Sequence, residues 1–201
     1  ATAREFALAA PTGARAHIAH ASTKGAVAFI RDATRRGARV TAETAPHYFM
    51  LTHALLASRD ACYRMNPPLR EEDDRRVIRR AVIDGTIDCI ATDHAPHTAQ
   101  EKAVFETAPN GVVGLETSLA VTLTKLYHDR HVSLTRVIEL LSTRPARVLG
   151  IEGGTLREGA RADIVLFDKE REWTVHPDEL VSRSKNTVFK GMTLKGKVIR
   201  T

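Results

Sequence analysis

The sequence has 201 residues, of which 43% are hydrophobic, 27% are charged and 5% are aromatic. This length allows one well-filled hydrophobic core or two small ones, and the composition is that of a globular protein. Thirty basic and 24 acidic side chains give a net charge of +6, but the arginine pairs lie beside acids on predicted helices, as on solvated helix faces. We therefore expect no nucleic-acid partner. No apolar stretch approaches the roughly 20 residues that span a bilayer, so no membrane role is expected.

Strands and helices alternate in the first half of the chain. The opening residues 2–10 are predicted to be part of a helix, so we expect the protein to continue upstream. Strands are predicted at residues 14–19, 39–44 and 87–91, with helices at 22–37 and 71–84 between them. Ser22 is the expected N-cap of the first of these helices, and glycines end both of them. Strands separated by helices predict parallel βαβ units.

The second half of the chain changes from helical to β-rich. A polar loop at residues 94–113 is followed by an apolar stripe typical of an amphipathic helix, formed by Leu115, Leu119, Leu123 and Leu126. Further helices are predicted at 134–141, with Ser133 as the candidate N-cap, and at 146–149. Strands are predicted at 163–168, 173–175 and 195–200. We place a boundary near residue 152, between an α/β part at residues 1–152 and a small antiparallel β part at residues 153–201.

The most informative segment runs from Ile87 to His97, where an apolar strand ends in Asp93, His94 and His97. The carboxyl ends of parallel strands are where α/β enzymes place catalytic groups. A carboxylate at Asp93 can bind a metal and move a proton, and an imidazole at His97 can hold an anionic group. The alternative for Asp93 is a side chain that caps the following turn. The two cysteines are far apart in the sequence, and Cys89 is expected to be a small buried apolar residue in a reducing, cytoplasmic setting.

Two other segments carry polar candidates. His17 and His20 lie on one predicted strand at a spacing that directs their side chains to opposite faces, so only His20, at the strand end, is a candidate metal ligand. A lone histidine in this position is often structural. Asn66 precedes a double proline and is either a turn residue or a fixed amide donor. Glu43 and His47 flank the end of the second strand without an assigned role.

Taken together, these segments resemble bacterial dihydroorotases, which are members of the amidohydrolase superfamily. The motifs that carry the resemblance are residues 16–25, 41–48, 65–70, 91–97 and 154–168. The segment around Asp93 is the most specific of them, whereas the last is shared widely across the superfamily. The resemblance implies an α/β fold, namely the C-terminal portion of a (β/α)8 barrel plus part of a small β-sandwich.

The resemblance also implies a zinc-dependent site, with two ions in the complete enzyme. It assigns His20 and Asp93 as zinc ligands, and Asp93 also as the general acid/base. The implied substrate-binding residues are Asn66, His97, Asn110 and Gly111. Family members often carry an aromatic residue in place of Asn110, so we expect that contact to come from backbone groups. Catalytic zinc generally has about three protein ligands, and a complete barrel takes about 250 residues, so the sequence is predicted to be an incomplete enzyme with little activity alone.

The implied reaction interconverts N-carbamoyl-L-aspartate and L-dihydroorotate in pyrimidine biosynthesis, in the cytoplasm. Its partners would be this small-molecule substrate and either a second copy, in a homodimer, or aspartate transcarbamoylase. Two alternatives remain open at this point. One is a related cyclic amidase, such as an allantoinase or hydantoinase. The other is a non-catalytic homologue that scaffolds aspartate transcarbamoylase.

Overall fold

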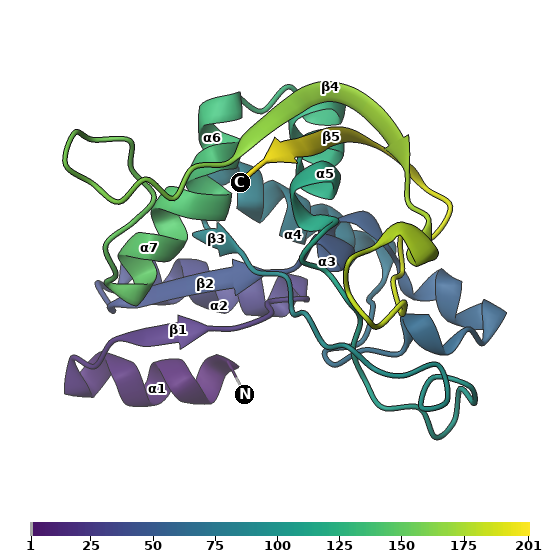
Figure 1. Cartoon of the computed structure of the whole chain (residues 1–201). Helices are drawn as coiled ribbons and strands as arrows, with labels where there is room; N and C mark the ends of the chain where they lie inside the picture. The colour runs from purple at the N-terminus through teal and green to yellow at the C-terminus, as the bar shows by residue number, and fades with distance from the viewer. Residues whose placement is uncertain (1) are drawn as a thin grey trace. The chain divides into compact units, whose positions relative to one another are not determined.

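A computed structural model describes residues 2–201, which form two compact units. The first unit comprises the chain up to Ala54 together with Pro67–Ala91, and the second comprises Leu55–Asn66 and Thr92–Thr201. Figure 1 shows the course of the chain through both. Across residues 2–201, every helix is too short or too polar to cross a membrane. These two units do not test the domain boundary that the sequence predicts near residue 152, and this boundary stays a prediction.

The first unit is built around a three-stranded parallel sheet. Its strands are β1 (Ala16–Ile18), β2 (Val40–Thr44) and β3 (Cys89–Ile90), in the order β1-β2-β3. His17 pairs with Thr41, and Glu43 pairs with Cys89. The predicted parallel βαβ arrangement is therefore confirmed, although each strand is shorter than its apolar run indicated.

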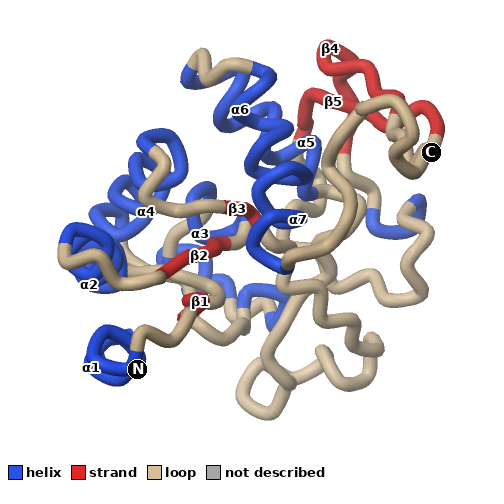
Figure 2. The backbone as a smooth tube through the Cα atoms, turned by 90° about the vertical axis from the view of Figure 1, so that its left-hand side faces the viewer, coloured by secondary structure: helices blue, strands red, loops and turns tan. Residues whose placement is uncertain are grey.

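Helices α1 (Thr2–Thr12), α2 (Lys24–Arg35) and α4 (Glu72–Asp84) complete the first unit, together with the short α3 (Pro46–Met50). Figure 2 shows α2 and α4 side by side along one side of the strands. Helix α2 buries Val27, Ile30 and Ala33. The prediction of Ser22 as its N-cap was wrong. Thr23 caps the helix, because its Oγ1 accepts a hydrogen bond from the Ala26 amide at 3.1 Å.

The second unit begins with short 3₁₀ turns, of which η2 (Ala61–Tyr63) lies wholly within it; η1 (His53–Ser58) spans the junction of the units. Its helical elements are α5 (Ser118–Thr122), η3 (Leu123–His128), α6 (Leu134–Ile138), η4 (Glu139–Thr143) and α7 (Arg144–Leu149). Ser133 caps α6 as predicted, by accepting a hydrogen bond from the Arg136 amide. Leu123, Leu126 and Leu140 are fully buried. These leucines form the helical part of the core of this unit.

The predicted position of Leu115 on the first of these helices was wrong. Leu115 is 63% exposed and precedes α5, because residues 114–118 form a turn in which the Ser118 amide donates to the Gly114 carbonyl at 3.0 Å. A Cβ at Gly114 would lie 2.7 Å from the Thr92 carbonyl oxygen. This close backbone approach requires glycine at the start of the turn.

Strands β4 (Leu166–Thr174) and β5 (Thr193–Arg200) form an antiparallel pair that packs against α5 and η3, with the short η5 (Pro177–Glu179) between the two strands. The prediction of a strand from residue 163 was wrong at its start, since pairing begins only at Leu166. Ile164 and Val165 are more than half exposed, so burial does not hold them in a sheet. A Cβ at Gly196 would lie 2.4 Å from Leu123 Cδ1, which explains why glycine stands where β5 crosses η3.

Candidate active site

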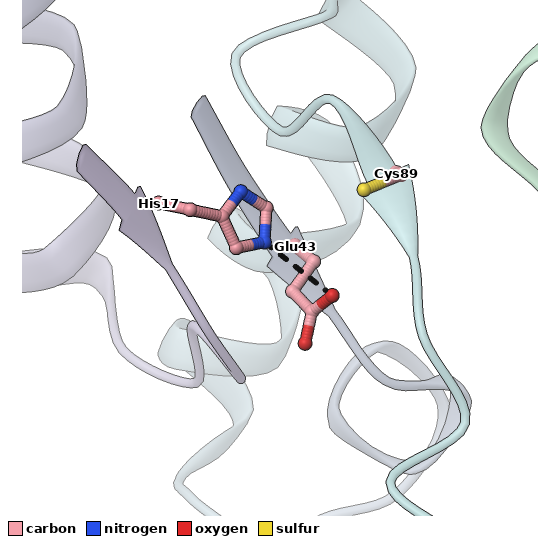
Figure 3. Close-up of side chains that lie close together, drawn as sticks. All are labelled: His17, Glu43 and Cys89. Carbon is pink, nitrogen blue, oxygen red and sulfur yellow. Dashed lines mark ion pairs between the residues drawn. The ribbon is translucent and has the colours of Figure 1, made fainter. Parts of the chain in front are cut away.

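Three side chains that can bind metal ions meet on one face of the parallel sheet. Glu43 and Cys89 are register partners on β2 and β3, and His17 on β1 pairs with Thr41, two residues before Glu43. Register partners and alternate residues point to the same face of a sheet. The ligand atoms of His17, Glu43 and Cys89 accordingly lie within 4.8 Å of one another, and Figure 3 shows the three side chains converging.

The carboxylate of Glu43 lies between two histidines. Its Oε2 is 3.4 Å from Nε2 of His17, and its Oε1 is 3.1 Å from Nδ1 of His20. Burial raises the pKa of Glu43, but hydrogen bonds and charge interactions with His20 and then His17 outweigh this effect, so its net pKa is lowered. Glu43 is therefore a carboxylate at neutral pH, with each oxygen directed at a different imidazole.

The expectation that strand alternation separates the side chains of His17 and His20 was wrong, because both rings reach Glu43. The assignment of His20 as the metal ligand of the two stays a prediction. Strand β1 ends at Ile18, and His20 has a left-handed backbone with φ of 54°. The two-residue alternation of a strand therefore no longer applies at His20, whose ring turns back toward the sheet. The alternation of side chains along a strand does not predict that the strand ends before His20.

Glu43 is the site residue that the sequence reasoning left without a role. The signal that could have found it is an acid at the carboxyl end of a short apolar strand, the same pattern that singled out Asp93. Its side chain is only 16% exposed. A carboxylate buried to this degree needs partners that offset its desolvation, and two imidazoles supply them.

His47 is the most deeply buried titratable residue beside this cluster. It is 1% exposed, and its Nε2 has no hydrogen-bond partner among the described residues. Burial and, to a lesser extent, the nearby charge of His20 lower its pKa from 6.5 to about 3. Its ring packs edge-on against Tyr48, with centroids 4.2 Å apart. His47 is thus a neutral imidazole at physiological pH.

Asp93 belongs to the second unit and shares an unusual backbone state with His20. Within residues 2–201, four non-glycine residues have positive φ, and they are His20, Arg59, Asp93 and His131. A non-glycine residue in this region is strained by about 1–3 kcal/mol, and such strain clusters at functional sites. Both predicted metal ligands therefore occupy conformations that favour glycine. Their joint binding of one ion stays a prediction.

The structure brings together three of the predicted substrate-binding residues in the second unit. His97 Nε2 donates to the Asn110 carbonyl at 3.0 Å, and the Gly111 amide donates to the Arg64 carbonyl at 3.0 Å. Gly111 has φ of 127°, and a Cβ there would lie 2.4 Å from that of Ala95 and 3.3 Å from His97 Nε2. Only glycine allows the two ends of this loop to approach so closely. Asn66 is exposed, and its role stays a prediction.

Asn186 holds the two ends of the loop together. Its Nδ2 donates to the Ala95 carbonyl at 3.1 Å and to the Gly111 carbonyl at 3.2 Å, and its Oδ1 accepts from the His97 amide at 3.4 Å. The residue is 5% exposed. Sequence reasoning missed it, because Asn186 is 75 residues or more from these partners in the chain.

Lys102 fixes the middle of the same loop. Its ammonium group donates to the carbonyls of Ala61, Arg64 and Pro109 at distances of 3.0, 3.2 and 2.8 Å. Burial is the main cause of its lowered pKa. His94 Nδ1 accepts from the Gly114 amide at 3.1 Å, so His94 orients the backbone. The loop at residues 94–113 is therefore held by side chains at both ends and in the middle.

Comparison with known proteins defines the class. Residues 3–201 match the model of the amidohydrolase family, and the chain belongs to this family. Its fold resembles L-hydantoinase from Arthrobacter aurescens, with a TM-score of 0.92 and 28% identity over 99% of this chain and 46% of that one. It also resembles D-hydantoinase from Thermus sp., with a TM-score of 0.91 and 27% identity over 98% and 45% of the two chains. The α/β amidohydrolase fold expected from the sequence is thereby confirmed.

The curated relatives narrow the resemblance. The chain is 51% identical to dihydroorotase from Trichlorobacter lovleyi over 98% of its own length and 46% of the relative. It is 53% identical to dihydroorotase from Desulfotalea psychrophila over 96% and 46% of the two lengths. The sequence-based resemblance to dihydroorotases is confirmed. The chain spans about half the length of the curated relatives that it matches.

Proposed function

We propose that this chain carries the C-terminal half of a dihydroorotase site, which interconverts N-carbamoyl-L-aspartate and L-dihydroorotate in pyrimidine biosynthesis. The observation that carries the proposal is the identity of about half of all residues with dihydroorotases along nearly the whole chain. In this proposal residues 1–152 are part of a (β/α)8 barrel and residues 153–201 are part of a small β-sandwich. The remaining strands, and the rest of the site, would come from the complete protein.

His20 and Asp93 are the proposed zinc ligands, in a centre of two ions. The residues present fit this metal, because zinc takes imidazole and carboxylate ligands. Oε1 of Glu43 lies 3.1 Å from Nδ1 of His20, which leaves the opposite ring nitrogen as the proposed ligand atom, and carboxylates support many metal-binding histidines in this way. When bound, zinc would polarise the ring carbonyl of the substrate and acidify a water molecule.

The remaining chemistry belongs to side chains. In the hydrolytic direction Asp93 would accept the proton of the attacking water and deliver it to the leaving amide nitrogen. His97, Asn66 and the backbone groups of Asn110 and Gly111 would hold the substrate carboxylate and ring edge. The rigid loop supports this role, because a fixed substrate reaches the geometry of attack at a lower entropic cost.

The test is an assay of the complete protein that contains this chain, with dihydroorotate, hydantoin and allantoin as substrates. We expect hydrolysis of dihydroorotate, and an Asp93→Asn variant that folds normally but has no turnover. Retained activity in this variant would remove Asp93 from the base role. Full zinc content with no activity on dihydroorotate would reject the proposed reaction. We expect the isolated chain to be inactive, because it provides only two of the proposed zinc ligands.

A second candidate is a hydantoinase-type cyclic amidase, favoured by the likeness of the fold to hydantoinases. The same three-substrate assay separates it from the first, because preferred hydrolysis of hydantoin would establish it. A non-catalytic subunit bound to aspartate transcarbamoylase is the alternative to both. Its signature would be stable complex formation without zinc.

For the active enzyme we propose a cytoplasmic location, with a homodimer or a complex with that transcarbamoylase as its assembly.

A further inference from the structure

We propose that His17, Glu43 and Cys89 form an additional binding site for a thiophilic divalent cation, namely zinc or cadmium. The site uses donor atoms other than those of His20 and Asp93, and it does not depend on the proposed reaction. The three side chains come from three adjacent strands, β1, β2 and β3. The register of the sheet, rather than a mobile loop, thus determines where the donor atoms lie.

The distances suit a tetrahedral ion. With bonds of about 2.0–2.2 Å to nitrogen and oxygen, two ligand atoms of tetrahedral zinc lie about 3.4 Å apart. His17 Nε2 and Glu43 Oε2 are separated by 3.4 Å. The sulfur of Cys89 lies within 4.8 Å of both partners, and it would approach to about 3.6 Å of them on completing a three-ligand set. The fourth position would be left to water.

The donor atoms are also oriented for this purpose. Thr41 Oγ1 lies 2.8 Å from Nδ1 of His17, which leaves Nε2 directed at Glu43. A hydrogen bond on one ring nitrogen that presents the other to the metal is the usual arrangement of metal-binding histidines. Because Glu43 contacts His20 through its other oxygen, Oε2 is the atom available to the site. One carboxylate can therefore serve both histidines.

The identity of the ion follows from the thiol. Sulfur, imidazole and carboxylate together select zinc or cadmium over calcium and magnesium, which require oxygen ligands. Cys89 is 4% exposed, whereas the His17 side chain is 31% exposed, so an ion would enter from the side of His17. On binding, the Cys89 thiol would lose its proton to solvent and a sulfur–metal bond would form.

The competing interpretation is structural. His17 and Glu43 would then be a partly exposed ion pair, and Cys89 a small apolar core residue. The two interpretations differ in one measurable property, which is whether the Cys89 thiolate binds a metal together with the other two groups. Cys62 provides a matched control, because it is the other cysteine of the chain and burial helps to raise its pKa to about 11.

The experiment is a cadmium titration of the 201-residue chain, followed by the ultraviolet charge-transfer band of the cadmium–thiolate bond. We expect a stoichiometric band in the wild type and in Cys62→Ser, and no band in Cys89→Ser. The His17→Gln and Glu43→Gln variants should bind at least about tenfold more weakly, since each lacks a direct ligand. Circular dichroism of each variant verifies that it is folded, and His17→Gln changes the most exposed of the three residues.

Three outcomes would overturn the proposal. They are no band in the wild type, a band that depends on Cys62, and a band that depends on Cys89 but is unaffected by both glutamine variants. The last result would mean that cadmium binds a thiol alone. Activity toward dihydroorotate is not part of this readout, so the failure of either proposal is recognised separately.

Discussion

Nδ1 of His20 lies 3.1 Å from Oε1 of Glu43, so a carboxylate holds the imidazole that we propose as a zinc ligand. A Glu43→Gln substitution keeps the shape of the side chain but removes its charge. We predict a 10- to 100-fold loss of zinc affinity in the complete protein, the range typical of such supporting partners. A competition titration with a chromophoric chelator measures it.

This titration is best made in a Cys89→Ser background, so that zinc at the additional site does not contribute. Glu158→Gln is the matched control, because Glu158 is an exposed acid in another part of the chain. Equal zinc affinity in the two glutamine variants would show that Glu43 does not support His20.

The buried His47 predicts a specific pH dependence of stability. Its pKa is about 3 in the folded protein, against 6.5 for an unperturbed histidine. Between these values the unfolded chain binds a proton that the folded chain does not, so the free energy of unfolding falls as the pH drops below 6.5. The slope from this residue is at most about 1.4 kcal/mol per pH unit. Well above pH 6.5, where the histidine of the unfolded chain is also neutral, His47 contributes no slope.

Urea unfolding at pH 7.5, 6.5 and 5.5 measures this effect, in a range above the titration of carboxylates. The His47→Gln variant, which cannot be protonated, should show a clearly shallower decline between pH 6.5 and 5.5. An identical decline in both proteins would mean that His47 does not contribute to the acid sensitivity.

Gly111 provides a test of the close approach in the substrate loop. In a Gly111→Ala variant the added methyl group would clash with Ala95, and the residue would keep a strained φ of 127°. We predict that this substitution lowers the free energy of unfolding by about 2 kcal/mol or more. Gly150→Ala is the control, since Gly150 also has positive φ but its Cβ would meet no atom within 4 Å. It should cost about 1 kcal/mol. Equal losses would remove the steric argument.

Asn186 should control the rigidity of the same loop. Asn186→Leu leaves the carbonyls of Ala95 and Gly111 without their shared donor, which costs about 1–3 kcal/mol for each buried group left unpaired. We predict faster amide hydrogen exchange across residues 94–113. The exposed Asn66 is the control, because Asn66→Ala should leave this exchange unchanged. Unaltered exchange in the leucine variant would contradict the role of Asn186.

The parallel sheet could be predicted from the sequence, because apolar runs between amphipathic helices leave few other topologies. The alignment of Glu43 with Cys89 could not, since register depends on how β2 and β3 meet across 46 residues of chain. The exact first residue of a helix could not be predicted either, because neighbouring residues can serve equally as its N-cap. Ser22 and Thr23 are both favourable N-cap residues, and the backbone conformation decides which hydroxyl faces the free amide.

The candidate site likewise contains residues that the sequence predicts and residues that it does not. Asp93 and His97 could be singled out, because their polar groups follow an apolar strand directly. Asn186 could not, because nothing in its own segment distinguishes an asparagine that binds two distant carbonyls from one in a surface turn. Residues that act through tertiary contacts leave little trace in local sequence.

The left-handed backbone of His20 and Asp93 has a consequence for how the protein tolerates change. At both positions a glycine would remove the backbone strain, since glycine adopts this conformation without steric cost. Selection for thermal robustness alone would therefore push these two positions toward glycine, whereas selection for metal chemistry would oppose it. A glycine at either one would mark a homologue that has exchanged its reactivity for a less strained fold.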